Sequence, residues 1–523
     1  ERNRQLTLQT NVVDIDVAAG DGSPAMWGIN GYVEATYDPL NRLATGFADL
    51  ESENFGINIP KLFTHTWEYN YVNGSIGFHA DLSDGLDLSL VSGTLVANSD
   101  AVDGRAVFTS TIHRPLEGKA SSEFELLVGA RRVDASLKAL YLPDGPNVRG
   151  GMRDTMEWLD RAIIGGDVYD SAVVYRGSTM PDAEAVTKTF QSFFLLTNGE
   201  VEFSEEWPEL KALNALVLTD DNNVDVEVSS GQSMGIDMMQ VTAVVRSNAE
   251  EENWLSIDGR ARGRTGQGLD YLQVSPVNQR FRDGLANWEA QGEFSADIAV
   301  SVPFNQDGVN TQVMLEIMLA ENEITIPEYA LDLGNVSGPI VFDSSSGLET
   351  TELSLVLFER PVKVTLSSQL SNGELGVINL DAVGAVDPST FIQWPLHSSF
   401  MRDLLRGMTG EMNYHAMLAI HQGVNSAVPT GLFLESDLLG AELSLPDPLS
   451  KAAAEVLPLQ LDITLASSGQ EIKGFLGSDL NFNLKIANGR VDSGVVYVGE
   501  PDGYLGTLLS SEIRGVAIIG ATD

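Results

Sequence analysis

The segment "FRDGLANWEAQGEFSADIAVSVPF", from Phe281 to Phe304, contains the two patterns that decide the fold class. Its second half places apolar residues at every second position from Phe294 to Val302. Successive side chains of a β-strand point to opposite faces, so this alternation predicts a strand with one apolar and one polar face. Its first half has the spacing of a short amphipathic helix, and Gly292 marks the corner between the two.

The same alternation recurs along the chain. Apolar residues occupy every second position in 353–357, 362–366 and 461–465. Short runs rich in Asn, Asp and Gly lie between such segments, and these residues favour hairpin turns. The predicted turns are "TNGEVEF" at 197–203, "DDNNVD" at 220–225, "SNGEL" at 371–375 and "ANGRVDSG" at 487–494. The sequence therefore predicts a mainly antiparallel β-sheet.

Few segments have helical periodicity, and they are short. Ser275 and Pro276 form a typical helix start, and apolar residues then follow on one face at 277, 281, 285 and 288. A similar stripe runs from Met152 through Met156 and Leu159 to Ile163. We expect such helices to cover the apolar face or an end of the sheet.

An Arg-Asp pair opens three similar segments. The other two are "MRDTMEWLDRAIIGGDVYDSAVVYRG" from Met152 and "MRDLLRGMTGEMNYHAMLAI" from Met401. The arginines at 153, 282 and 402 are 129 and 120 residues apart, and a near-constant interval indicates a repeated unit. We interpret each pair as an ion pair on a helix surface rather than as a catalytic dyad. The predicted modules are residues 1–140, 141–270, 271–390 and 391–523.

The composition excludes several functional classes. The 523 residues include 74 acidic and 31 basic side chains, a net charge of −43. This acidity argues against binding nucleic acid or docking a basic face on anionic lipid, and is typical of adaptation for solubility or salt. The chain has no Cys, which excludes disulfides and thiolate metal sites. It also has no run of about 18 apolar residues that could span a membrane.

Four motifs suggest chemistry, and each has a simpler interpretation. "GQSMG" at 231–235 matches a nucleophile elbow around Ser233, but the following sequence alternates like a strand, which favours a Gly-rich hairpin. Asp221, Asn223 and Asp225 begin a calcium-loop pattern that lacks Gly at its sixth and Glu at its twelfth place, which favours a polar turn.

The other two motifs are the histidines and an Arg-Gly run. His415 and His421 lie near alternating sequence and do not form a metal-ligand pair on a helix. "GRARGRTGQG" at 259–268 resembles an RNA-binding patch, but in so acidic a chain we expect a solvated linker. The sequence thus predicts neither a metal nor a cofactor.

The predicted sheet has an apolar face that the few helices cannot cover. The sheet must therefore close as a sandwich or barrel, or remain an elongated curved sheet whose apolar groove is filled by something apolar. Alternation places one set of side chains on that face: Phe294, Ala296, Ile298, Val300, Val302, Leu353, Leu355, Leu357, Val362, Val364, Leu366, Leu461, Ile463 and Leu465.

Several long stretches resemble the YhdP family, large AsmA-like envelope proteins of Gram-negative bacteria. The similarity lies in "LYLPDGPNVRGGMRDTMEWLDRAIIGGDVYDSAVVYRG" (140–177), "FSEEWPELKALNALVLTDDNNVDVEVSSG" (203–231), "YLQVSPVNQRFRDGLANWEAQGEFSADIAVSVPF" (271–304), "LGNVSGPIVFDSSSGLETTELSLVLFERPVKVTL" (333–366) and "SDLLGAELSLPDPLSKAAAEVLPLQLDITL" (436–465). The last of these is the most specific.

The resemblance implies a curved β-groove of repeating modules that moves phospholipid between the inner and outer membranes. It implies a periplasmic, non-enzymatic protein with no catalytic residues. The family also has an N-terminal membrane anchor and a longer C-terminal part, so both ends of this sequence are expected to be cuts through a longer polypeptide. The alternatives are a structural or adhesive β-repeat protein with a closed core, and a serine hydrolase that uses Ser233.

Overall fold

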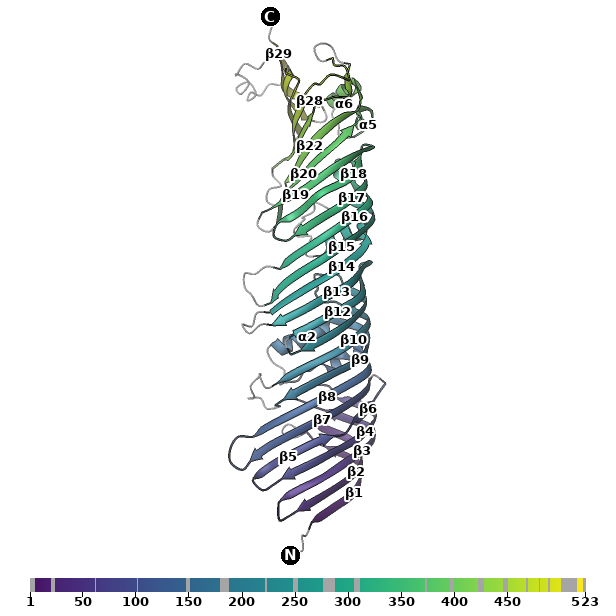
Figure 1. The fold of residues 1–523 in the computed structure, drawn as a ribbon, viewed down its shortest axis with the longest axis vertical. Coiled ribbons are helices and arrows are strands. Elements are labelled where there is room, and N and C mark those ends of the chain that lie inside the picture. Colours follow the sequence, from purple (N-terminus) through teal and green to yellow (C-terminus); the bar gives the residue numbers. More distant parts are fainter. Residues whose placement is uncertain are drawn as a thin grey trace. The chain divides into compact units, whose positions relative to one another are not determined.

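The structure, a computed structural model, is mainly β, as the alternation predicts (Figure 1). Of the strands, 27 are assigned to one sheet and two, β21 and β24, form a second one. The structure describes residues 5–520 except 20–23, 62, 101, 147–150, 179–187, 222, 248–252, 276–286, 305–310, 372–373, 396–398, 422–427, 445–449, 467–468, 479, 488–489 and 500–514.

The chain divides into two compact units, and unit 1 comprises residues 1–259 and 301–309. Its strands pair antiparallel with their neighbours in chain order, except that β5 and β6 both lie between β4 and β7. They are β1 (Leu6–Val17), β2 (Ala25–Asp38), β3 (Leu43–Asn58), β4 (Trp67–Asp81), β5 (Gly85–Ser92), β6 (Leu95–Asn98), β7 (Val102–Pro115), β8 (Ser121–Asp134), β9 (Ile163–Gly177), β10 (Thr189–Val201), β11 (Leu210–Asp220), β12 (Asn223–Ser233) and β13 (Ile236–Ser247).

Unit 2 comprises residues 260–300 and 310–523. Its described strand pairs are antiparallel apart from β28–β29, which is parallel. The strands are β16 (Gln312–Ile326), β17 (Leu331–Asp343), β18 (Gly347–Leu357), β19 (Arg360–Ser371), β20 (Glu374–Val386), β21 (Met408–Gly410), β22 (Met412–His421), β23 (Thr430–Ser436), β24 (Ala441–Leu443), β25 (Leu459–Ala466), β26 (Gly469–Leu476), β27 (Leu480–Ala487), β28 (Arg490–Val498) and β29 (Gly515–Gly520).

Short helices interrupt the strand order after β8, β14 and β20. Strands β14 (Asn253–Arg264) and β15 (Glu289–Phe304) are each divided between the units. The described helices are η1 (Ala135–Leu137), α1 (Lys138–Tyr141), α2 (Gly151–Ala162), α3 (Thr265–Val274), η3 (Pro327–Tyr329), α5 (Pro388–Phe391) and α6 (Ser399–Arg406).

The first and third of these helical segments begin in the same way. Asp134 accepts hydrogen bonds from the amide and the hydroxyl of Ser136, at 2.9 and 2.7 Å. Asp387 accepts the equivalent bonds from Ser389, at 2.8 and 2.7 Å. These bonds satisfy amides at the helix start that have no partner within the helix, and the serine bonds lower the pKa of both carboxyl groups. The helical segments after β8 and β20 therefore begin with the same Asp-x-Ser cap.

The predicted helices are partly confirmed. The stripe from Met152 does form α2, which ends at Ala162, so Ile163 already belongs to β9. Ser275 is the residue that caps the end of α3, and the helix predicted from Pro276 onward, with Arg282, lies outside the described residues. Gly292, predicted as the corner before the strand, lies inside β15 and has a φ of 108°.

Three of the four predicted turns are confirmed as two-residue hairpins, because Asp220 pairs with Asn223, Ser371 with Glu374 and Ala487 with Arg490. The prediction of a turn at "TNGEVEF" is wrong. Thr197–Val201 lies inside β10, where the strand register shifts around Asn198. Asn and Gly adopt the positive φ that a bulge needs as readily as the one that a turn needs, so the dipeptide does not distinguish them.

Bulges of this kind recur on neighbouring strands and are linked by side chains. In unit 1, Asp14 on β1 and Gly28 on β2 both have positive φ. Asn30 accepts from the Asp14 amide at 3.0 Å and donates to the Gly28 carbonyl at 3.0 Å. The side chain two residues after one bulge therefore holds the bulge of the preceding strand, and we name this arrangement the bulge clamp.

The bulge clamp occurs again in both units. In unit 2, Ser337 accepts from the amide of Glu321 at 2.8 Å and donates to the carbonyl of Asn335 at 3.2 Å. In unit 1, Asn214 makes the same two bonds, at 3.3 Å each, to Asn198 and Ala212. A bulge bends its strand and increases the local twist, so clamped bulges on adjacent strands curve the sheet along a common line.

The prediction of a solvated linker at Gly259–Gly268 is wrong. These residues finish β14 and begin α3. Arg260 bonds to Asp297 at 3.1 Å, and Arg262 bonds to Glu293 at 2.8 Å, both partners being on β15. The Arg-Gly alternation therefore places its guanidinium groups along one polar strand face, where β15 carboxylates neutralise them.

Candidate functional site

The apolar face that the sequence predicted is present in unit 2. A cluster of buried residues runs across β16, β17, β18 and β19, and half-buried side chains of β15, β20 and β22 pack against it. Leu353 pairs with Val364 and Leu355 with Val362, so facing side chains contact one another across the sheet. Further clusters of this type span β16–β20, β23 with β25–β27, and, in unit 1, β9–β12.

These four clusters share one property. All their members come from strands that are neighbours in the sheet, so the apolar side chains are covered by their lateral neighbours. In a sandwich, by contrast, the core contains side chains from two facing sheets. Leu353 and Val364 remain 7% and 8% exposed, and many other members are only half-buried.

Burial in these strands follows the predicted alternation. Asp297, Ser354 and Thr365 are exposed, whereas the predicted apolar residues around them are not. Of the predicted set, Ala296, Leu353, Leu355, Val362, Val364 and Leu461 are buried. The half-buried remainder is Phe294, Ile298, Val300, Val302, Leu357, Leu366, Ile463 and Leu465.

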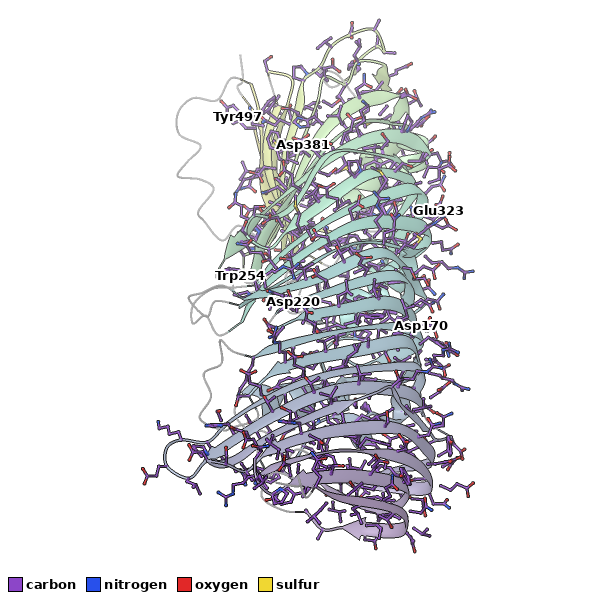
Figure 2. The ribbon with its side chains drawn as sticks, turned by 60° about the horizontal axis from the view of Figure 1, so that its bottom comes forward. Asp170, Asp220, Trp254, Glu323, Asp381 and Tyr497 are labelled. Atoms are coloured by element: carbon purple, nitrogen blue, oxygen red, sulfur yellow. The ribbon has the colours of Figure 1, made fainter. Side chains whose placement is uncertain are left out.

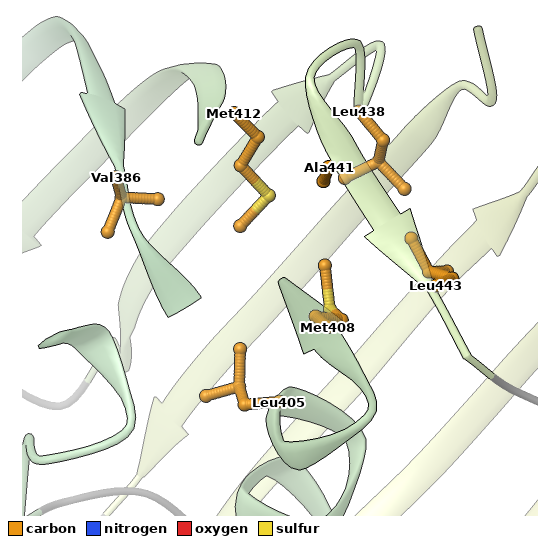
Figure 3. Close-up of a cluster of buried hydrophobic side chains, with 7 residues drawn as sticks. All are labelled: Val386, Leu405, Met408, Met412, Leu438, Ala441 and Leu443. Atoms are coloured by element: carbon orange, nitrogen blue, oxygen red, sulfur yellow. The ribbon is translucent and has the colours of Figure 1, made fainter. Parts of the chain in front are cut away.

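A different kind of core lies at one end of these strands in unit 2 (Figure 3). There α5, α6, the β21–β24 sheet and the segments 437–440 and 450–457 form what we name the insert. Leu405 of α6 and Leu438 are 4% and 1% exposed, and they cluster with Val386 and Met412 of the large sheet. Among the described clusters this one combines helical and strand residues, so it is a closed core.

A buried lysine holds the insert together. The ammonium of Lys451 donates to the carbonyls of Leu438, Ala441 and Ala452 at 2.7, 2.6 and 3.1 Å. Its three donors are therefore matched by three acceptors, although burial lowers the pKa of Lys451. Sequence analysis missed this residue; the signal was a lone Lys beside three Ala in the Leu- and Pro-rich run "LPDPLSKAAAEVLP".

Aromatic side chains fix the insert to the hairpin ends of the sheet. Phe391 of α5 contacts Phe358, which lies in the β18–β19 turn, with ring centroids 5.1 Å apart. Trp394 donates to the carbonyl of Tyr329 in η3 at 2.9 Å. Arg360 and Glu411 add an ion pair at 2.9 Å. The insert is thus attached at the hairpin ends of the strands, as expected for helices that cover an end of a sheet.

Ser233 has the environment of a hairpin residue. It ends β12 and pairs with Ile236, so Met234 and Gly235 form a two-residue turn in which both φ values are positive. Its side chain is buried and donates to the carbonyl of Glu209 at 3.0 Å. An elbow needs a helix after the serine, and here a strand follows, so the hairpin interpretation is confirmed.

The calcium-loop pattern also forms a hairpin. Asp221 lies in the turn between β11 and β12 and accepts the amide of Phe190 at 2.8 Å. Asp225 forms an ion pair with Arg246 at 2.5 Å. The part of the chain that the structure describes holds no group of three His, Asp or Glu side chains arranged to bind a metal.

The Arg-Asp pairs do not form the expected bond in α6. There Asp403 pairs with Arg406 at 2.7 Å, one helical turn away, rather than with Arg402. In α2, Arg153 lies 3.8 Å from Glu157 and donates to the carbonyl of Gly145 at 3.1 Å. Three- and four-residue spacings place side chains together on a helix, whereas adjacent side chains diverge.

His415 joins three strands on the face opposite the apolar one. Its ring nitrogens lie 2.9 Å from Asp381 of β20, labelled in Figure 2, and 3.0 Å from Glu435 of β23. The hydrogen bond to Asp381, followed by that to Glu435, raises the pKa of His415. A raised pKa in the folded state means that the protonated ring stabilises the fold.

We therefore expect His415→Gln to destabilise unit 2 at low pH only. The contribution of His415 is fully present below the unfolded pKa of about 6.5 and is lost as the pH rises through the higher folded value. Because the three side chains are partly exposed, the loss should not exceed about 1 kcal/mol. Urea unfolding across this range measures it, with Met417→Gln, on the same strand and face, as a control. A pH-independent loss would contradict the assignment.

Comparison with known proteins agrees with this architecture. A family model described as YhdP protein matches residues 2–517. The chain belongs to the YhdP family. A curated relative, the intermembrane phospholipid transporter YhdP of Escherichia coli (strain K12), is 23% identical over 364 residues, which are 69% of this chain and 27% of the relative. The chain thus spans about a quarter of that YhdP protein. No solved structure matches the chain.

The family assignment confirms the resemblance found in the sequence. Among the described helices, none is long and apolar enough to cross a membrane. Sequence reasoning placed the strands of the YhdP family fold and their apolar face. It missed the insert, because β21 and β24 have three residues each and lack a recognisable alternation.

Proposed function

We propose that this chain is a segment of a non-enzymatic conduit that carries phospholipid across the periplasm from the inner to the outer membrane. The acyl chains lie in an apolar groove formed by the curved sheet, and the polar headgroups remain in water. The E. coli relative bears the name of an intermembrane phospholipid transporter, which supports this choice of cargo.

One observation carries the proposal: four apolar clusters are built from successive strands and contain no facing layer among their described members. A half-buried apolar surface of this extent needs an apolar partner. Removing apolar area from water contributes about 25 cal/mol per Å², so such a surface offsets much of the cost of drawing an acyl chain out of a bilayer.

The lining of this groove is the predicted set of apolar side chains. On β15, Ile298 and Val300 remain half-buried and so keep surface for contact with lipid. The opposite face is polar and includes Asp297 and the carboxylates that flank His415. That face stays in solvent, in keeping with the net charge of −43.

The proposed modules, 1–140, 141–270, 271–390 and 391–523, extend the groove by repetition. Helical segments follow β8, β14 and β20, close to the three proposed internal boundaries. The membranes themselves are contacted by parts of the protein outside this chain, including an inner-membrane anchor.

Extraction of the purified chain tests the function. We expect phospholipid to co-purify and to survive gel filtration, as native mass spectrometry would record. A lipid-free protein that also takes up no lipid from phosphatidylethanolamine vesicles would favour the closed-core alternative, a structural or adhesive repeat. The hydrolase alternative lacks support, since Ser233 is buried in a hairpin.

A further inference from the structure

The insert covers only part of the apolar face of unit 2. Strand pairing orders that face into rows across β20, β22, β23 and β25. The first row contains Val386 opposite Met412, and the second contains Gly384 opposite Tyr414. The third row contains Ala382 opposite Ala416, then Leu434 opposite Leu461. The fourth row contains Leu380 opposite Leu418, then Leu432 opposite Ile463.

The first two rows contact the insert. Val386 and Met412 belong to its closed core, and Tyr414, Leu459 and Leu476 pack against it. Burial raises the pKa of Tyr414 to about 12, which agrees with a phenol shielded from water. Leu459 and Leu476 face each other across β25 and β26, so the covered rows continue across these strands.

The fourth row is absent from that core. Leu418, Leu432 and Ile463 lie on the same face as Tyr414 and Leu459, two rows further from the insert. They are half-buried, as are Tyr414 and Leu459, but only the latter two pack against the insert core. The insert therefore leaves the fourth row uncovered.

We propose that acyl chains in this part of unit 2 bind along the third and fourth rows, and that the insert excludes them from the first two. We name the third and fourth rows the lipid track, and the insert confines bound lipid to it. This inference rests on the proposed function, and it adds which side chains touch lipid and which do not.

Photocrosslinking on one strand tests the boundary. In two separate variants, the photoreactive residue benzoylphenylalanine replaces Ile463 or Leu459, which lie on the same face of β25. Each variant is mixed with vesicles of phosphatidylethanolamine and phosphatidylglycerol that carry ³²P in the lipid headgroup. We expect several-fold more label at Ile463. Equal labelling at the two positions would overturn the inference. Asp462, exposed on the opposite face, gives the background.

A second pair of labelling positions, on β22, tests the same boundary in case the Leu459 variant does not fold. Leu418 and Tyr414 are related in the same way on β22, and replacing Tyr414 exchanges one aromatic side chain for another. Ile317 of β16, outside the insert core, reports on the proposed function itself. Background labelling at Ile317, Leu418 and Ile463 alike would reject the function. Label at Ile317 with none at Leu418 and Ile463 would reject only the track.

Loosening the insert should extend the track. Lys451→Met removes the ammonium that joins three carbonyls of the insert, without altering a strand row. In the variant that carries this change, we expect label to appear at Leu459 and Tyr414. If the insert amides exchange faster but both positions stay at background, the insert is not the barrier and the proposal fails.

Discussion

Ile298→Asp should lower the phospholipid bound by the purified chain about tenfold, the equivalent of about 1.4 kcal/mol, while leaving its circular dichroism spectrum unchanged. Ile298 is half-buried on the apolar face of β15. A carboxylate there is hydrated when lipid is absent, so folding tolerates it. When an acyl chain occupies the same surface, the charge must lose its water or interrupt the contact.

Ser295→Asp is the matched control, because Ser295 is exposed on the opposite face of the same strand. It adds the same charge and should leave lipid content unchanged. Normal lipid loading in Ile298→Asp would refute the assignment of this face to lipid. Failure of Ile298→Asp to fold would indicate a closed core, where an unpaired buried charge costs several kcal/mol.

Truncation of Leu438 should have the largest effect on stability. Leu438 is 1% exposed within the insert core, so Leu438→Ala leaves a cavity that neighbouring side chains cannot fill. Such cavities cost about 3 kcal/mol. Hydrogen exchange measures the loss locally, and we expect the amides of α6 and β24 to lose protection.

The equivalent truncation on the proposed track should cost much less. Leu432 is half-buried on β23, so Leu432→Ala removes partly solvated surface and creates no enclosed void, at a cost of about 1 kcal/mol. The difference between these two leucine variants distinguishes a closed core from an open face. Equal losses would show that both sites are enclosed.

The strands were predictable because alternation records burial directly. Leu353, Leu355 and Leu357 occupy one face whichever partner strand is adjacent, so the single sequence suffices. The insert was not predictable in the same way. Its core brings α6, Leu438 and the two short strands together from separate segments, and Lys451 is satisfied by carbonyls that local sequence does not identify.

Buried polar side chains were also beyond sequence reasoning. Asn322 is 0% exposed, and it donates to the carbonyl of Glu293 at 3.0 Å and accepts from the hydroxyl of Thr265. It thereby joins β16 to β15 and to the start of α3. An Asn in a strand pattern predicts a turn or bulge, and only the folded chain shows which partners it reaches.

The bulge clamp has a consequence for how errors in folding spread. In an alternating strand, a slip of one residue would exchange the apolar and polar faces over the whole strand. Asn30, Asn214 and Ser337 each accept an amide of the preceding strand and donate to a carbonyl two residues back on their own strand. If the preceding strand slipped by one residue, its bulge amide would move out of reach of the clamp. Each clamp therefore favours the native register of the strand before it.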